Sequence, residues 1–215
     1  MSRRFRAERR RDPYYRAAQA EGLRSRAAFK LGHLDRRFHL LRPGLRVLDL
    51  GAAPGGWSLV AAERVGPTGR VVAVDPRAVE PIVGVEFVRG RVGDPRLLLR
   101  LGDERFDLVL SDLSPRISGA YATDHARSVA LARDAFLLAR ERLAPGGAFV
   151  TKAFDGELLP GFERDLATEF ARVVRTKPPA SREHSSELYV LAFGFRTGPA
   201  EDDRRSSGAP RASDI

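Results

Sequence analysis

The sequence contains no cysteine at all. This absence excludes a disulfide framework, a thiolate nucleophile and a cysteine-based zinc site. Any chemistry must therefore come from lysine, aspartate, glutamate, histidine or a cofactor, and we expect no metal site. A chain without cysteine also suits the reducing cytoplasm, where we expect a monomeric protein.

Lysine is scarce as well. Of the 37 basic residues, 34 are arginine and only three are lysine, at Lys30, Lys152 and Lys177. Arginine binds phosphate and carboxylate well but never deprotonates, whereas a lysine amine in a partly dry pocket can lose its proton and act as a base. A lysine kept in so arginine-rich a chain is therefore a candidate for chemistry. The alternative is a solvated surface lysine, and Lys152 alone does not decide between the two.

Long apolar runs are also missing. No run approaches the roughly 18 residues of a membrane span, and the first residues lack the apolar centre of a signal peptide. We therefore expect a cytoplasmic protein with no membrane partner. A length of 215 residues with 43% hydrophobic composition predicts one domain with a full core.

The positive charge is concentrated at the start of the chain. Residues 1–42 hold 13 basic and four acidic residues, whereas the remaining residues hold 24 of each sign. A basic arm over residues 1–22 suits contact with a polyanion, which could be RNA, DNA or anionic lipid. Phe5, Tyr14 and Tyr15 stand among the arginines and favour nucleic acid. A solvated tail is the alternative, and a mitochondrial transit peptide is a weaker one because the arm contains acids.

Helical and strand-like patterns alternate after the arm. A helical apolar stripe runs from Ser25 to Leu41, with Lys30 at its edge, and ends before Pro43 and Gly44. The strand-like apolar stretches are residues 45–51, 69–75, 85–90, 106–112, 147–154, 171–176 and 187–196. A helix is expected after the first of these stretches, and the longest helical pattern spans about 123–143.

This alternation predicts an α/β fold over residues 23–196, with a mostly parallel seven-stranded sheet and helices on both faces. Ligands of such sheets bind beyond the carboxyl ends of the strands. The polar residues 197–215, rich in Pro, Gly and Ser, are expected to be disordered.

The stretch "LDLGAAPGGW" places a glycine loop at the end of the first strand. Gly51, Gly55 and Gly56 let the backbone approach a ligand, but they do not form G-x-G-x-x-G, and no G-K-[ST] is present. Asp75 ends the next strand, where an acid can bind the two hydroxyls of a ribose. These features predict a nucleoside cofactor without pyrophosphate, for which S-adenosylmethionine is the obvious candidate. A tight structural turn is the alternative for the glycines alone.

Two further polar residues belong to the same crevice. Asp112 in "SDLSP" closes the fourth strand, and Lys152 in "VTKAF" lies at the end of the fifth. Both should face the glycine loop, because the carboxyl ends of parallel strands share one edge of the sheet. Taken singly, Asp112 could be a helix cap. Glu187, at the start of the last predicted strand, could likewise be a surface acid.

The chain resembles the FtsJ family of ribosomal RNA 2′-O-ribose methyltransferases along residues 12–196. The stretches that carry the resemblance are "DPYYRAAQAEGLRSRAAFKL", "DLGAAPGGWS", "EPIVG", "SDLSP", "LAPGGAFVTKAFDGE" and "SREHSSELYVLAFG". The resemblance implies a Rossmann-like class I methyltransferase fold. It also implies a catalytic tetrad formed by Lys30, Asp112, Lys152 and Glu187, so two of the three lysines are tetrad positions.

The resemblance further implies which residues hold the cofactor. The expected S-adenosylmethionine contacts are Gly55, Trp57, Asp75 and Asp112, beside Gly51 of the loop. Two positions depart from the family. Arg91 stands where the family has an acid near the adenine, and Asp94 is the expected substitute. Arg116 stands where the family has asparagine, so it could contact a phosphate or alter the pocket for the cofactor's methionine part.

The implied substrate is a uridine in the loop of large-subunit ribosomal RNA that receives aminoacyl-tRNA (the A-loop), within the assembled subunit. Transfer RNA and a role as a non-catalytic RNA-binding assembly factor are alternatives. Methylation of a base is less compatible with the sequence. Carbon-5 pyrimidine methylation usually needs a cysteine, and exocyclic-amine methylation commonly uses [DN]-P-P-[FY], which "SDLSP" lacks.

Overall fold

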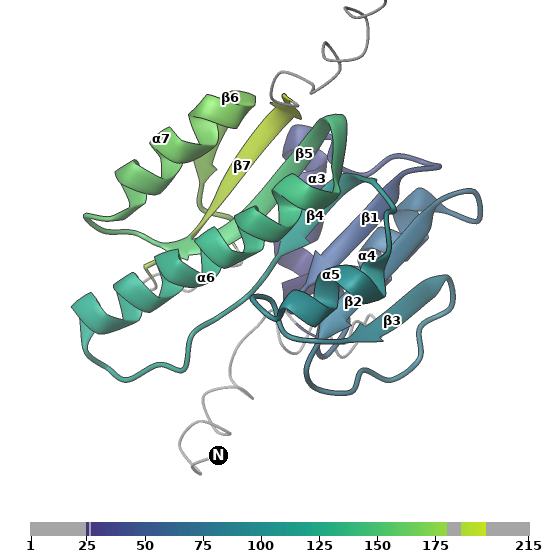
Figure 1. The fold of residues 1–215 in the computed structure, drawn as a ribbon, viewed down its shortest axis with the longest axis horizontal. Coiled ribbons are helices and arrows are strands. Elements are labelled where there is room, and N and C mark those ends of the chain that lie inside the picture. Colours follow the sequence, from purple (N-terminus) through teal and green to yellow (C-terminus); the bar gives the residue numbers. More distant parts are fainter. Residues whose placement is uncertain (1–24, 26, 180–185, 197–215) are drawn as a thin grey trace, which may run out of the picture.

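The computed structural model describes residues 25, 27–179 and 186–196. The arm predicted at residues 1–22 and the tail predicted at residues 197–215 lie outside these residues. The elements shown in Figure 1 are, in order, α3 (Ala27–Phe38), β1 (Arg46–Leu50), α4 (Gly56–Val65), β2 (Arg70–Asp75), β3 (Val85–Arg89), α5 (Pro95–Leu101), β4 (Phe106–Ser111), α6 (Tyr121–Arg142), β5 (Leu143–Phe154), α7 (Leu159–Glu169), β6 (Phe170–Thr176) and β7 (Glu187–Phe195).

The strands form one seven-stranded sheet with the order β3-β2-β1-β4-β5-β7-β6. The pairs β1–β2, β2–β3, β1–β4 and β4–β5 are parallel, whereas β7 runs antiparallel to both β5 and β6. The predicted mostly parallel sheet is confirmed. The strand order reverses between β1 and β4, and a crevice for ligands opens at such a point.

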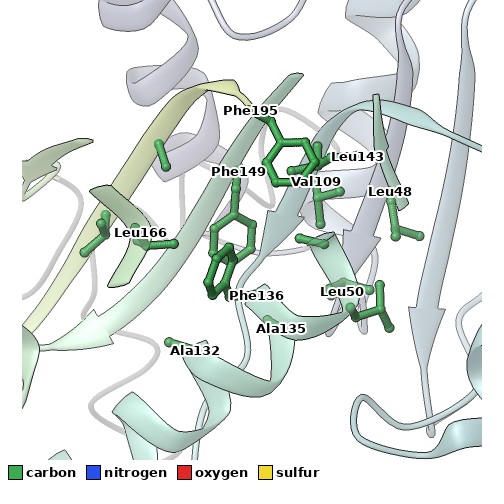
Figure 2. Close-up of a cluster of buried hydrophobic side chains, with 14 of the residues drawn as sticks. Leu48, Leu50, Val109, Ala132, Ala135, Phe136, Leu143, Phe149, Leu166 and Phe195 are labelled. Atoms are coloured by element: carbon green, nitrogen blue, oxygen red, sulfur yellow. The ribbon is translucent and has the colours of Figure 1, made fainter. Parts of the chain in front are cut away.

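Helices cover both faces of the sheet (Figure 1): α5, α6 and α7 lie on one face and α3 and α4 on the other. Figure 2 shows the hydrophobic core between the sheet and the helices α5, α6 and α7, where Phe136 of α6 packs against Phe149 of β5. The central strands β1 and β4 are mostly apolar because both of their faces are buried. Within the described residues, no helix is both long and apolar enough to cross a membrane.

The helix predicted from Ser25 to Leu41 is shorter than expected. Helix α3 ends at Phe38, and His39 follows with φ 52° while its N–H donates to the carbonyl of Asp35 at 2.7 Å. The Asp35 side chain accepts a hydrogen bond from the N–H of Leu41 at 2.8 Å. The Asp35 carboxylate thus caps the carboxyl end of the helix several residues before Pro43. Leu41, predicted as part of the apolar face of the helix, is buried in the segment that follows the helix.

Candidate active site

The glycine loop joins β1 to α4 in a conformation that needs glycine. Gly51 has φ 81°, and Gly55, the residue before α4, has φ 108°. A Cβ at Gly51 would lie 2.8 Å from Leu113, and a Cβ at Gly56 would clash with the hydroxyl of Ser25. Side chains are therefore disfavoured at the glycine positions of the loop, and its backbone can approach a ligand closely there.

Two buried oxygens beside this loop have no hydrogen-bond partner among the residues that the structure describes. The Oδ1 of Asp49 and the Oγ of Ser25 accept and donate no hydrogen bond within the described part of the chain, although Ser58 donates to the other Asp49 oxygen at 2.6 Å. Both residues line a small cavity of about 20 Å³ that also contacts Asp112. Buried polar atoms normally have partners, and a cavity of this size has room for about one water molecule or one small polar group of a ligand.

Asp49 is completely buried, and burial raises the pKa of its carboxyl to about 7. The negative charges of Asp112 and Asp75 act in the same direction, whereas the hydrogen bond from Ser58 lowers the pKa. Between pH 4 and pH 7 the folded chain therefore holds a proton at Asp49 that the unfolded chain has lost. The contribution of the Asp49 carboxyl to the free energy of unfolding is therefore largest below about pH 4, and it is lost as the pH rises to about 7.

We expect Asp49→Asn to remove this loss of stability. The rise of the Asp49 pKa from 3.8 to about 7 corresponds to a loss of at most about 4 kcal/mol in the free energy of unfolding. The asparagine keeps an acceptor for Ser58 but cannot ionise, so its free energy of unfolding should fall less than that of the unchanged chain between pH 5 and pH 8. Urea denaturation at both pH values measures the difference. The same pH dependence in both proteins would show that Asp49 does not titrate in this range.

The acid at the end of β2 is buried and fully engaged. Asp75 accepts hydrogen bonds from the N–H groups of Ala53 at 3.1 Å and Arg77 at 2.8 Å, and the Arg77 guanidinium approaches it to 3.1 Å. Arg77 was not predicted from the sequence, although it lies only two residues after Asp75. Both line a cavity of about 780 Å³ together with Gly51, Asp112 and Lys152. The residues predicted at the carboxyl ends of β1, β2, β4 and β5 thus meet at one cavity.

Lys152 and Asp112 form a close pair in this cavity. The Lys152 amine lies 3.2 Å from the Asp112 carboxylate and donates to the Asp112 backbone carbonyl at 3.1 Å. Only 5% of the Lys152 side chain is exposed. Tyr189 of β7 faces Lys152 in the sheet register, and its hydroxyl donates to the same carboxylate at 2.8 Å. The amine is therefore held in one position and points toward the cavity.

Lys30 and Glu187 form the second pair. Lys30 of α3 donates to the Glu187 carboxylate at 2.8 Å, and their side chains are 5% and 20% exposed. Lys30, predicted at the edge of its apolar stripe, is buried, and its partner comes from the far end of the chain. The Lys30 amine also lies 5.7 Å from the centre of the Tyr189 ring. The four residues predicted as a tetrad are thus two ion pairs that both contact Tyr189.

Tyr189 was not predicted from the sequence as a residue of the site. It lies two residues after Glu187 in β7, so strand alternation places both on the same face, and this signal was available. Its ring packs against Trp57 with centroids 5.6 Å apart, and the Trp57 indole donates to the carbonyl of Ala27 at 2.7 Å. Trp57, predicted as a cofactor contact, is buried and lines the small cavity beside Asp49.

The two departures from the family pattern lie in different places. Arg91 lines the large cavity, whereas Arg116 is exposed and is not among the cavity residues. Asp94 is not among them either, because its carboxylate caps α5 by accepting from the N–H of Arg96 at 3.0 Å. Asp134 of α6 does line the cavity, and a Cβ at Gly93 would lie 3.9 Å from its carboxylate.

These observations define a class of protein. The strand order, the glycine loop between β1 and α4, and an acid at the end of β2 are the features of a Rossmann-like class I methyltransferase. The chain belongs to the FtsJ-like methyltransferase family, which matches residues 23–195. It is therefore an S-adenosylmethionine-dependent methyltransferase, and the unpartnered oxygens of Asp49 and Ser25, found within the described residues, and the glycine positions of the loop fit this cofactor.

Individual relatives agree with the family. The chain is 46% identical to ribosomal RNA large subunit methyltransferase E of Halorubrum lacusprofundi, over 90% of this chain and 74% of that protein. It is also 46% identical to the protein of the same name from Azoarcus, over 86% of this chain and 92% of that protein. A crystal structure assigned to a ribosomal RNA methyltransferase of Plasmodium falciparum aligns with TM-score 0.74 and 27% identity, over 80% of this chain and 98% of that one.

Proposed function

We propose that this protein transfers the methyl group of S-adenosylmethionine to a ribose 2′-hydroxyl of large-subunit ribosomal RNA, at a uridine of the A-loop. The names and the high coverage of the relatives support the substrate. The observation that carries the reaction type is the Lys152 amine, held by Asp112 at the edge of the cavity that the glycine loop and Asp75 line. A fixed, nearly buried amine suits the activation of a hydroxyl.

The reaction forms an O–C bond and breaks a C–S bond. The cofactor, when bound, supplies an electrophilic methyl group on a positively charged sulfur, which leaves neutral. We assign Lys152 to hold the attacking hydroxyl and, as the neutral amine, to receive its proton, and Asp112 to hold Lys152 in place. Tyr189 fixes Asp112 through its hydroxyl. We assign Glu187 and Lys30, the ion pair beside Tyr189, to the same site, and most of the gain in rate comes from positioning the reactants.

The cofactor would be held by the loop and by the strand ends. We assign Gly51 and Gly55 to backbone contacts, Asp75 to the ribose hydroxyls, and Trp57 to the wall beside the methionine part. Because the Asp75 carboxylate is engaged by the Arg77 side chain, that side chain must move away when the ribose binds.

Methyl transfer from labelled cofactor identifies the RNA. We expect label in isolated large ribosomal subunits and far less label in transfer RNA and small subunits. Preferential labelling of transfer RNA would replace the proposed substrate by the main alternative. A protein that binds S-adenosylmethionine in calorimetry but labels no RNA would be the non-catalytic assembly factor.

Two carboxylates, Asp134 and Asp94, are candidates to bind the adenine of the cofactor, and their surroundings differ. The Asp134 side chain makes no hydrogen bond or ion pair with another described residue, whereas the Asp94 carboxylate is occupied as a helix cap. We expect Asp134→Asn to weaken S-adenosylmethionine binding about tenfold or more, the usual scale for a hydrogen bond to a charged group. Asp94→Asn is the matched control and should change the affinity only a few-fold.

An analogue makes this test specific. S-inosylhomocysteine carries an oxygen where S-adenosylhomocysteine carries the adenine amine. The unchanged protein should prefer the amine, and Asp134→Asn should lose that preference in calorimetry. A loss of affinity in Asp94→Asn alone would instead support Asp94, the residue predicted from the sequence.

The basic arm is expected to contribute to RNA affinity and not to cofactor affinity. Removing residues 1–11 deletes six arginines and one glutamate. If about half of these arginines contact phosphates, the slope of log affinity against log salt should fall by about 2 in magnitude. Filter binding of ribosomal RNA at several salt concentrations measures the slope. An unchanged slope would show that the arm touches no phosphate.

The monomeric state and the cytoplasmic location stay predictions. The division into a basic arm, a methyltransferase domain over residues 23–196 and a tail is likewise a proposal.

A further inference from the structure

A second cavity opens beside the tetrad. Its volume is about 430 Å³, within the range of small-ligand sites. It is lined by Tyr121 at the start of α6, by Arg175 and Lys177 at the end of β6, and by Glu187 and Leu188 at the start of β7. Glu187 therefore belongs both to the tetrad and to this cavity. None of the residues assigned to the cofactor lines it.

The Tyr121 ring is exposed but fixed. Its side chain is among the exposed large hydrophobic ones, with 63% of the residue accessible. Its hydroxyl donates to the carbonyl of Asp155 at 2.6 Å, and its ring stacks on His125 with an interplanar angle of 9°. One edge and one face of the ring are thus held by the protein.

His125 in turn is held at both nitrogens. Its Nδ1 donates to the carbonyl of Phe154 at 3.1 Å, and its Nε2 accepts from the N–H of Leu158 at 3.1 Å. The turn before α6 is also fixed, because the Asp124 carboxylate accepts from the backbone N–H groups of Ser118 and Gly119. An exposed ring on such a rigid support does little for the core, and it is prepared to stack against a flat ligand.

The charges of the cavity indicate where a backbone could pass. Arg175 is engaged by carboxylates, since its guanidinium contacts Glu163 at 2.6 Å and Asp155 at 3.2 Å. Lys177 is exposed one residue beyond the end of β6. Its exposed ammonium carries three N–H donors, so it can donate to a phosphate at this rim in addition to the contacts that Lys177 already makes within the chain.

We propose that this cavity binds the base of a substrate RNA nucleotide adjacent to the methylated one, with Tyr121 as the stacking surface and Lys177 as the phosphate contact. This proposal rests on the proposed function, because it places the reacting ribose beside Lys152 and Glu187. A nucleotide next to that ribose must pass close to Glu187, and the cavity begins at this residue. Stacking on an aromatic ring accepts any base and holds a splayed-out single strand.

Two substitutions at Tyr121 separate the ring from its hydroxyl. Tyr121→Leu removes the stacking surface, whereas Tyr121→Phe keeps the ring on His125 and loses only the bond to Asp155. Stacking contributes about 1–3 kcal/mol per base, so Tyr121→Leu should lower kcat/KM on large ribosomal subunits by about 5- to 150-fold. Tyr121→Phe should stay within a few-fold. Melting temperature and S-adenosylmethionine affinity should be unchanged in both.

A binding probe tests the proposal without catalysis. The full-length chain, saturated with S-adenosylhomocysteine, is titrated with single-stranded RNAs that carry fluorescent 2-aminopurine on one or the other side of a uridine. We expect quenching for one of the two RNAs with the unchanged protein and with Tyr121→Phe, and none with Tyr121→Leu. Equal quenching by Tyr121→Leu, or its absence in the unchanged protein, would overturn the proposal. A failure of methyl transfer with quenching intact would instead overturn the proposed function.

The phosphate contact has its own readout. Lys177→Gln should lower the slope of log affinity against log salt by about one, whatever the RNA sequence. Arg196→Gln is the matched control, because this substitution also removes one positive charge. Arg196 follows the last residue of β7, whereas the cavity lies at the first residues of that strand. Equal slopes for the two variants would remove Lys177 from the site.

Discussion

Replacing Lys152 by arginine should lower single-turnover methyl transfer by about two orders of magnitude or more, the usual scale for loss of a general base. The substitution keeps the charge but removes the ability to lose a proton. It also replaces a compact amine, held 3.2 Å from the Asp112 carboxylate, by a broad planar group. The cavity of about 780 Å³ in front of Lys152 gives the longer side chain room, so the chain should still fold.

A pair of variants distinguishes the roles of Lys152. Lys152→Met keeps most of the length and removes the charge. If an amine able to give up its proton is required, arginine and methionine should both fail; if only positive charge is required, arginine should work and methionine should not. Melting temperature and S-adenosylmethionine affinity, measured on the same preparations, should stay within a few degrees and a few-fold. Near-normal transfer by Lys152→Arg would refute the assigned role.

Replacing Glu187 by glutamine should damage both stability and activity. The substitution leaves the Lys30 ammonium, only 5% exposed, without its carboxylate. Breaking a buried pair from one side costs about 3–5 kcal/mol, and the lower end applies because a fifth of the Glu187 side chain is exposed. The melting temperature should fall by roughly 6–12 °C. Methyl transfer, measured well below the melting temperature, should fall about 100-fold.

The double variant Lys30→Met, Glu187→Leu separates the two effects. Apolar side chains of similar size often replace a buried ion pair at no cost, so most of the lost stability should return. Activity should not return if Lys30 and Glu187 contribute to the reaction. A stable double variant with full activity would show that the pair is structural only.

The sequence predicted the sheet well because the signal for a buried strand is local. Each central strand is an apolar run between turn residues, and covering both faces of a parallel sheet requires such runs. The start of β5 was missed for a related reason. The strand begins at Leu143 rather than at residue 147, because Leu143 pairs with Phe106 across a register shift, and the intervening "APGG" resembles a simple helix stop.

The residues of the site were predicted more completely than their surroundings. Periodicity within one helix cannot show that Glu187 approaches Lys30 from 157 residues away, so the burial of Lys30 was not foreseen. Tyr189 and Arg77 were missed although each lies two residues from a predicted site residue. Asp94 precedes a proline that opens α5, which is a common signal of a helix cap and could have indicated its role.

The most direct test of the central claim is the chemical position of the transferred methyl group. Large ribosomal subunits labelled by the protein with S-adenosylmethionine are deproteinised, and their RNA is hydrolysed with alkali. A 2′-O-methyl group blocks cleavage of its own linkage, because cleavage needs the free 2′-hydroxyl. The proposed reaction predicts that the label is recovered in dinucleotides resistant to alkali, with uridine as the methylated member. Recovery of the label in mononucleotides would place the methyl group on a base and contradict ribose methylation.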